Sequence, residues 1–123
     1  MQILTMMGPL HVDAFANDQN AKLKRFFTLS TLKNAEGWDC FQQEQRKGER
    51  WYMFPSPILI AQTIAMIQRQ SVQGVLILPK WMAQPWWPLV ADRKQIDLRD
   101  DTLVPTEAAW RTLKGTRWIA VEV

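Results

Sequence analysis

Two proline-rich turns carry the side chains with the clearest potential for chemistry. The first reads FPSP at positions 54–57, and the second reads PKWMAQPWWP at positions 79–88. Aromatic rings stack on nucleic-acid bases, which contributes about 1–3 kcal/mol per base, and lysine contacts phosphate. The second turn therefore predicts three stacking faces and one phosphate contact: Trp81, Trp86, Trp87 and Lys80. The alternative for Trp86 and Trp87 is that they lock this loop onto the helix as part of the core.

A polar stretch, QQEQRKGER at positions 42–50, precedes the first of these turns. It contains Arg46, Lys47 and Arg50 around Gly48. Such a run is most often a solvated loop. Alternatively, its cations contact phosphates, because they flank the aromatic run at 51–54 and could position a nucleic-acid backbone there.

A short strand predicted over 10–15 carries Asp13. An acid that follows a strand and precedes a helix is often the residue that holds ribose or adenosine hydroxyls. The alternative is that Asp13 or Asn17 caps the turn that follows. Both interpretations stay open from the sequence.

The composition limits the classes of function. The chain has 123 residues, which predicts one domain, and Lys and Arg exceed Asp and Glu by 15 to 12, a net charge of +3 that suits an anionic partner. No apolar run approaches the roughly twenty residues of a membrane span, and the first ten residues lack a targeting pattern, so we expect a soluble protein with no membrane partner.

Cysteine and histidine are too scarce for several common chemistries. The single Cys40 excludes an internal disulfide and fits a cytoplasmic or nuclear protein. One Cys and one His, His11, cannot by themselves build a tetrahedral metal site, so no metal is predicted. The two residues are 29 positions apart with no nucleophile elbow, which disfavours hydrolase chemistry.

The elements that must position the two turns form a strand, helix and strand. Positions 51–54 are aromatic, and 58–70 contain no Gly or Pro and place Ile60, Ile64 and Ile67 at helical spacing. Positions 75–78 are entirely β-branched or aliphatic, as in a strand buried on both faces. A crossover of this kind predicts two parallel strands, with a ligand site between the turns at their carboxyl ends.

The rest of the chain predicts further short elements around this unit. We expect strands at 10–15, 26–29, 95–98 and 118–123, a short apolar segment at 38–41 and a helix at 106–113. Positions 1–9 are a possible disordered lead or an edge strand, and 89–104 form a connecting segment. That segment alternates acids with bases, which predicts a poor phosphate-binding surface.

Several of these patterns, taken in order, resemble one family. They are D-x-F-A-x-x-x-N-A-K at 13–22, an aromatic-basic pair at 25–26, Trp-Asp at 38–39, F-P-x-P at 54–57, L-I-L-P-x-W at 76–81, Q-P-W-W-P at 84–88 and W-R-x-L-x-G at 110–115. Together they resemble the Dam-like DNA adenine methyltransferase domain of phages and of DIRS-type, tyrosine-recombinase retrotransposons. The resemblance covers about positions 12–115.

This resemblance implies a small Rossmann-like three-layer α/β domain with a mostly parallel sheet, spanning 1–123 as one methyltransferase-like unit. In active members it implies S-adenosylmethionine as the cofactor. The residues at the matching positions for cofactor binding are Asp13, Phe15, Asn20 and Asp39. The sequence lacks the Gly-rich turn that lets a backbone approach a cofactor closely.

The catalytic hallmark of the family is an Asn/Asp-Pro-Pro-aromatic turn, whose polar groups accept hydrogen bonds from the amine of a flipped adenine. Here Phe54 stands at the Asn/Asp position, Pro55 is kept, Ser56 replaces the second proline and Pro57 replaces the aromatic residue. Loss of one such transition-state hydrogen bond costs roughly 10²–10³ in rate. The turn is therefore degenerate.

We favour a catalytically degenerate domain that is retained as a nucleic-acid-binding module, for DNA or a single strand, with no bound cofactor. One alternative is an active S-adenosylmethionine-dependent DNA adenine methyltransferase with an unusual turn. Another is a protein-interaction subunit of a larger assembly, because Trp, Met and Arg are enriched at such interfaces.

Overall fold

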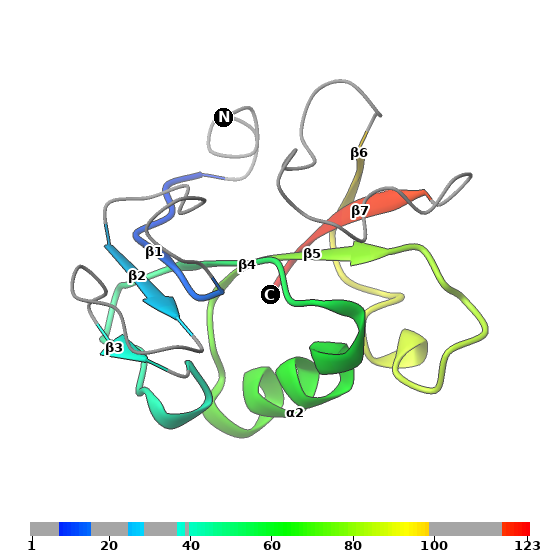
Figure 1. The fold of residues 1–123 in the computed structure, drawn as a ribbon. Helices are drawn as coiled ribbons and strands as arrows, with labels where there is room; N and C mark the ends of the chain where they lie inside the picture. Colours follow the sequence, from blue (N-terminus) through cyan, green and yellow to red (C-terminus); the bar gives the residue numbers. More distant parts are fainter. Residues whose placement is uncertain (1–7, 16–24, 29–36, 39, 99–116) are drawn as a thin grey trace.

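The computed structural model describes residues 8–15, 25–28, 37–38, 40–98 and 117–123. These residues form a mixed α/β domain around a sheet with the strand order β3-β2-β1-β4-β5-β7-β6 (Figure 1). The strands are β1 (Val12–Asp13), β2 (Arg25–Thr28), β3 (Gly37–Trp38), β4 (Trp51–Met53), β5 (Gly74–Pro79), β6 (Gln95–Leu98) and β7 (Trp118–Glu122).

The sheet is parallel from β3 to β5, and its last two pairings are antiparallel. Neighbouring strands among β3, β2, β1, β4 and β5 all run in the same direction. Strand β7 lies antiparallel between β5 and β6. The expected parallel pairing is therefore confirmed at one end of the sheet, whereas the pairings at the other end are antiparallel.

The predicted central unit is confirmed. Strand β4 leads through a 3-10 turn (Pro57–Leu59) into helix α2 (Ile60–Gln70) and then into β5, which pairs in parallel with β4. The α-helix begins two residues later than the pattern predicted, because Pro57 sets up the tighter turn first. It ends at Ser71, whose φ of 54° is left-handed and breaks the helical path.

Gly74 allows β5 to approach β4 at the start of this pairing. Its φ is +150°, and a Cβ added there would lie 2.0 Å from the backbone oxygen of Trp51. The neighbouring contact is a hydrogen bond from Trp51 N to Gln73 O of 3.0 Å. Only glycine fits at this position without moving the β4 backbone.

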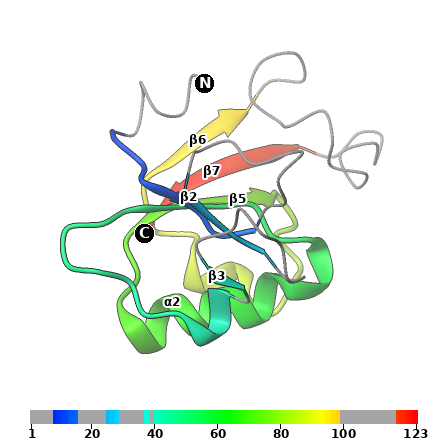
Figure 2. The same cartoon turned by 60° about the vertical axis from the view of Figure 1, so that its left-hand side comes forward.

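Both faces of the central strands are buried. Helix α2 covers one face (Figures 1 and 2), where its isoleucines pack against Trp51, Met53, Leu76 and Leu78. On the opposite face a second cluster gathers Tyr52, Phe54, Val75, Ile77, Trp118 and Ala120. Alternate residues of β4, β5 and β7 thus point to opposite cores, as the period of a strand requires.

The other predicted strands are present where the structure describes them: β6 has the predicted bounds, β2 is shifted by one residue, and β1 and β7 are shorter than predicted. The strands expected at 10–15, 26–29, 95–98 and 118–123 correspond to β1, β2, β6 and β7. Of the segment at 38–41, the first residue belongs to β3, and a 3-10 turn (Cys40–Gln42) follows. Positions 1–7, the helix predicted at 106–113 and the capping segment at 16–20 lie outside the described residues.

Candidate functional site

The strand order reverses between β1 and β4, so the carboxyl ends of these two strands flank the crevice where open α/β sheets bind ligands. Asp13 pairs with Tyr52, and Ala14 N donates a hydrogen bond of 2.9 Å to Tyr52 O. The predicted acid and the predicted FPSP turn are thereby brought to one edge of the sheet. We call it the carboxyl edge; it also carries the loop after β5.

Asp13 is only 2% exposed. Its Oδ1 accepts a hydrogen bond of 3.2 Å from Phe15 N, so the carboxylate closes the turn after β1. This is the turn-capping role that the sequence left open as the alternative. Phe15 is half-buried and packs edge-on against Phe41, with ring centroids 5.7 Å apart. Asn20 and Asp39, the other predicted cofactor ligands, lie outside the described residues.

Phe54, the first residue of the FPSP turn, lies in the core. Phe54 is 5% exposed, and its ring lies 5.6 Å from that of Trp118 on the face opposite α2. Pro55 is buried as well, whereas Ser56 and Pro57 are half-buried. Ser56 O accepts the hydrogen bond from Leu59 N, at 2.9 Å, that fixes the following turn. The Phe54 side chain offers no polar atom to a substrate amine.

The described residues at the predicted cofactor and substrate positions take part in the fold. The Asp13 carboxylate is buried and accepts a hydrogen bond from the Phe15 amide at its Oδ1. The turn at 54–57 offers an aromatic ring where the chemistry needs an acceptor. No catalytic step can be derived from this arrangement.

The tryptophans of the loop after β5 differ in exposure. Trp86 is 8% exposed and belongs to the core cluster under α2, so the core alternative is confirmed for this residue. Trp81 and Trp87 are half-buried and leave part of their rings accessible. Lys80 is held beside them, because its backbone N donates to Arg117 O at 2.7 Å.

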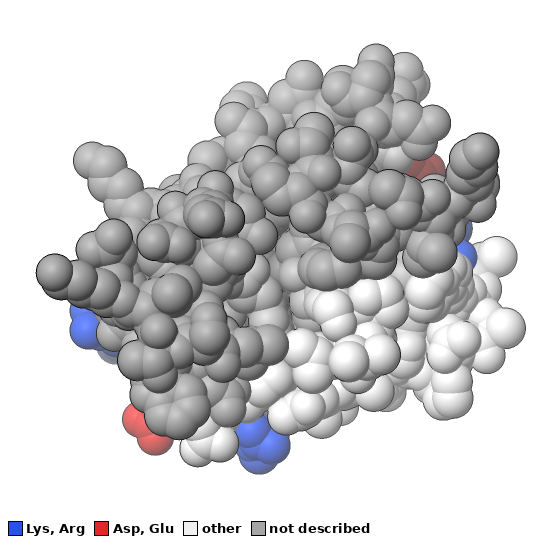
Figure 3. Space-filling model, viewed as in Figure 1, with Lys and Arg blue, Asp and Glu red and all other residues white. Residues whose placement is uncertain are grey.

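The carboxyl edge also exposes apolar side chains. Ile58 is 89% exposed, and Met82 and Leu89 are exposed too. Figure 3 shows that, over α2 and the loop after β5, the described surface of this face is largely free of charged side chains. Exposed apolar groups near partly exposed tryptophans are typical of a contact surface.

The cations of the loop at 42–50 do not join this surface. That loop ends where β4 begins, whereas Lys80 follows the end of the parallel strand β5. At roughly 3.3 Å per residue, the two ends of β5 are about 20 Å apart. The structure therefore does not bring Arg46, Lys47 and Arg50 together with Lys80. They lie at the opposite end of the strands, which we call the amino edge.

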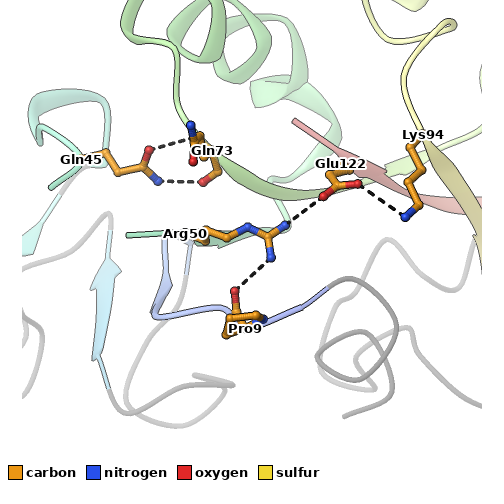
Figure 4. Close-up of polar contacts among 6 residues, drawn as sticks. All are labelled: Pro9, Gln45, Arg50, Gln73, Lys94 and Glu122. Carbon is orange, nitrogen blue, oxygen red and sulfur yellow. Dashed lines mark hydrogen bonds and ion pairs between the residues drawn. The ribbon is translucent and has the colours of Figure 1, made fainter. Parts of the chain in front are cut away.

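Loop 42–50 is tied to the domain by contacts that the sequence did not indicate. The Gln45 side chain forms two hydrogen bonds with the backbone of Gln73, of 2.7 and 2.8 Å (Figure 4). The buried Glu49 accepts a hydrogen bond of 3.0 Å from Trp51 Nε1. Arg46 and Lys47 remain exposed at the tip of the loop.

Comparisons of the chain with protein-family models, curated proteins and solved structures found no match. Within the described ranges, no group of three or more potential metal-ligating side chains gathers. The described helices include none with both the length and the apolar character of a membrane span.

Proposed function

We propose that this chain is a catalytically degenerate, Rossmann-like methyltransferase domain, similar to the Dam-like domain of retroelements, that binds single-stranded nucleic acid at its carboxyl edge without S-adenosylmethionine. Two observations carry the proposal. Phe54 is buried at the position of the catalytic acceptor, and the loop after β5, at the same edge of the sheet, carries the half-buried tryptophans Trp81 and Trp87.

The order of the strands supports the fold part of the proposal. From β3 to β5 the sheet follows the order of the doubly wound Rossmann sheet. The sheet departs from the Rossmann order at β7, which runs antiparallel between β5 and β6. An antiparallel strand inserted at this place is a feature of Rossmann-like methyltransferase sheets. Helix α2 supplies one covering layer, and the burial of the opposite face is consistent with the three-layer arrangement.

The packing of Phe54 supports the loss of catalysis. A polar residue introduced at this position would enter an apolar cluster with Trp118, Tyr52 and Ile77. Burying an unpaired polar group costs about 1–3 kcal/mol, so this core has adapted to the aromatic ring. The methyltransferase turn has become a structural turn.

The loop after β5 supports nucleic-acid binding. Trp81 and Trp87 are half-buried against the core, so each indole is partly accessible. Lys80 and Arg117 lie at the same edge, where their backbones are joined by a hydrogen bond of 2.7 Å. Stacking on each indole is worth about 1–3 kcal/mol and does not depend on sequence, since every base presents a flat face. This predicts binding of a short single strand with little base preference.

A fluorescently labelled oligothymidylate, titrated at two salt concentrations, tests the proposal. Trp87→Ala is expected to weaken binding about 5- to 160-fold. The matched control is Leu89→Ala, which removes an exposed apolar side chain from the same edge without removing a ring, and it should stay within about twofold of wild type. Equal effects of the two variants, or no binding by the wild type, would refute the proposal.

One observation favours a second candidate function, a protein-interaction subunit. Ile58, Met82 and Leu89 are the large hydrophobic side chains that the described residues leave exposed, and all three follow the carboxyl ends of β4 and β5. A protein partner would cover them together with Trp87. A mass that rises with protein concentration in analytical ultracentrifugation, without oligonucleotide binding, would favour this role.

A further inference from the structure

An open groove of about 750 Å³ lies at the amino edge, away from the site proposed above. Its walls come from the end of α2, the α2–β5 turn, the residue before β4, the turn before β6 and the end of β7. Charged or polar side chains among the lining residues are those of Arg50, Gln68, Ser71, Gln73, Arg93, Lys94 and Glu122. A volume of this size is within the range of small-ligand sites.

The cations of this groove are held by the fold. Arg50 Nη1 donates a hydrogen bond of 3.1 Å to Pro9 O, and Arg50 Nη2 lies 3.5 Å from Glu122 Oε1 (Figure 4). Lys94 Nζ lies 3.8 Å from the other Glu122 oxygen. In addition, Glu122 N donates to Lys94 O at 2.9 Å, which keeps the two residues side by side.

The charges in the groove do not cancel. Arg50, Arg93 and Lys94 contribute three positive charges against two negative ones, the side chain of Glu122 and the α-carboxylate of Val123, which line the same groove. Arg93 is exposed, as are Ser71 and Gln73, which line the same groove. Arginine is suited to phosphate, because its planar fork donates two parallel hydrogen bonds. The surplus of positive charge predicts an anionic ligand.

The sequence pattern concealed this arrangement, because Arg93 and Lys94 belong to the segment whose acids and bases nearly cancel. In the fold, Asp97 pairs with Ile119, whereas Lys94 lies beside Glu122, three residues along β7. Asp97 therefore lies further along the strand, outside the groove lining. Arg93 and Lys94 line the groove together with Arg50, which is distant in the sequence.

We propose that this groove binds the phosphate of a nucleotide unit, with Arg93 and Lys94 as the principal contacts and Arg50 as a fixed cation behind them. The unit is either a free nucleotide or one residue of a single strand, since both present the same phosphate chemistry. This inference goes beyond the function proposed above, because it uses the opposite edge and none of the same residues.

Calorimetric titrations of the whole chain with adenosine diphosphate and with hexathymidylate test this inference. The double variant Arg93→Ala/Lys94→Ala should weaken binding at least tenfold, and for the oligonucleotide it should reduce the salt slope by about 1.4. The matched control, Arg46→Ala/Lys47→Ala, removes the same charge from the amino edge outside the groove and should change affinity less than threefold.

A third variant should strengthen phosphate binding instead of weakening it. Glu122→Gln removes the carboxylate that competes for Arg50 and Lys94, and should tighten phosphate binding about 2- to 5-fold. If the wild type binds only adenosine diphosphate or only hexathymidylate, and Arg93→Ala/Lys94→Ala loses that binding, the site is supported. The probe that binds then shows whether the phosphate belongs to a free nucleotide or to a single strand. Binding of neither probe, or an equal loss in both double variants, overturns the inference. Trp87→Ala should keep the binding that Arg93→Ala/Lys94→Ala loses, which distinguishes the groove from the nucleic-acid site proposed at the carboxyl edge.

Discussion

Replacing Phe54 measures whether the turn at 54–57 is structural. The ring is 5% exposed and lies 5.6 Å from that of Trp118, so Phe54→Ala removes a buried aromatic side chain and leaves a cavity. Such truncations cost about 3–5 kcal/mol, a large part of the roughly 5–15 kcal/mol that stabilise a typical domain. Guanidinium denaturation followed by far-UV circular dichroism gives the free energy of unfolding directly.

A double-mutant cycle then assigns part of that loss to the ring pair. Phe54→Leu and Trp118→Leu keep the positions apolar, and their combination should reveal a coupling of about 0.5–1.5 kcal/mol. A loss below about 1 kcal/mol for Phe54→Ala, or a coupling indistinguishable from zero, would show that Phe54 is not held in the core. The turn would then be free to act on a substrate.

Two further predictions concern the backbone that positions the site. Gly74→Ala should lower the free energy of unfolding by about 3 kcal/mol or more, because the added Cβ would meet Trp51 O at 2.0 Å; an unchanged thermal midpoint would contradict this close approach. Ser71→Gly should raise stability by about 0.5–1 kcal/mol in chemical denaturation, because glycine adopts the left-handed φ of 54° without strain; a loss of stability would argue against that conformation.

The central unit was predictable because its patterns are strong and local. The isoleucines of α2 recur at helical spacing, and the residues of β5 form one apolar run bounded by Gly74 and Pro79. Proline and helical spacing act within a few residues, so the sequence alone carries them. The parallel pairing of β4 and β5 followed from the length of the crossover.

Strand direction and side-chain exposure depended on contacts between distant segments. The alternation of WIAVEV in β7 is the same for a parallel and an antiparallel strand, so it gave no direction. Trp86 and Trp87 are neighbours in a turn, yet Trp86 is buried in the core under α2 whereas Trp87 packs against that core and stays half-buried. Arg50 was separated from Lys80 by the topology, although their segments are similar in charge and flank the same unit.

The central proposal is that this domain binds a single strand and has no use for S-adenosylmethionine. Parallel calorimetric titrations of one preparation with S-adenosylmethionine and with oligothymidylate test it most directly. The account predicts no heat of binding for the cofactor, and oligonucleotide affinity that falls as salt is raised. Micromolar binding of S-adenosylmethionine, accompanied by methyl transfer to DNA, would contradict it.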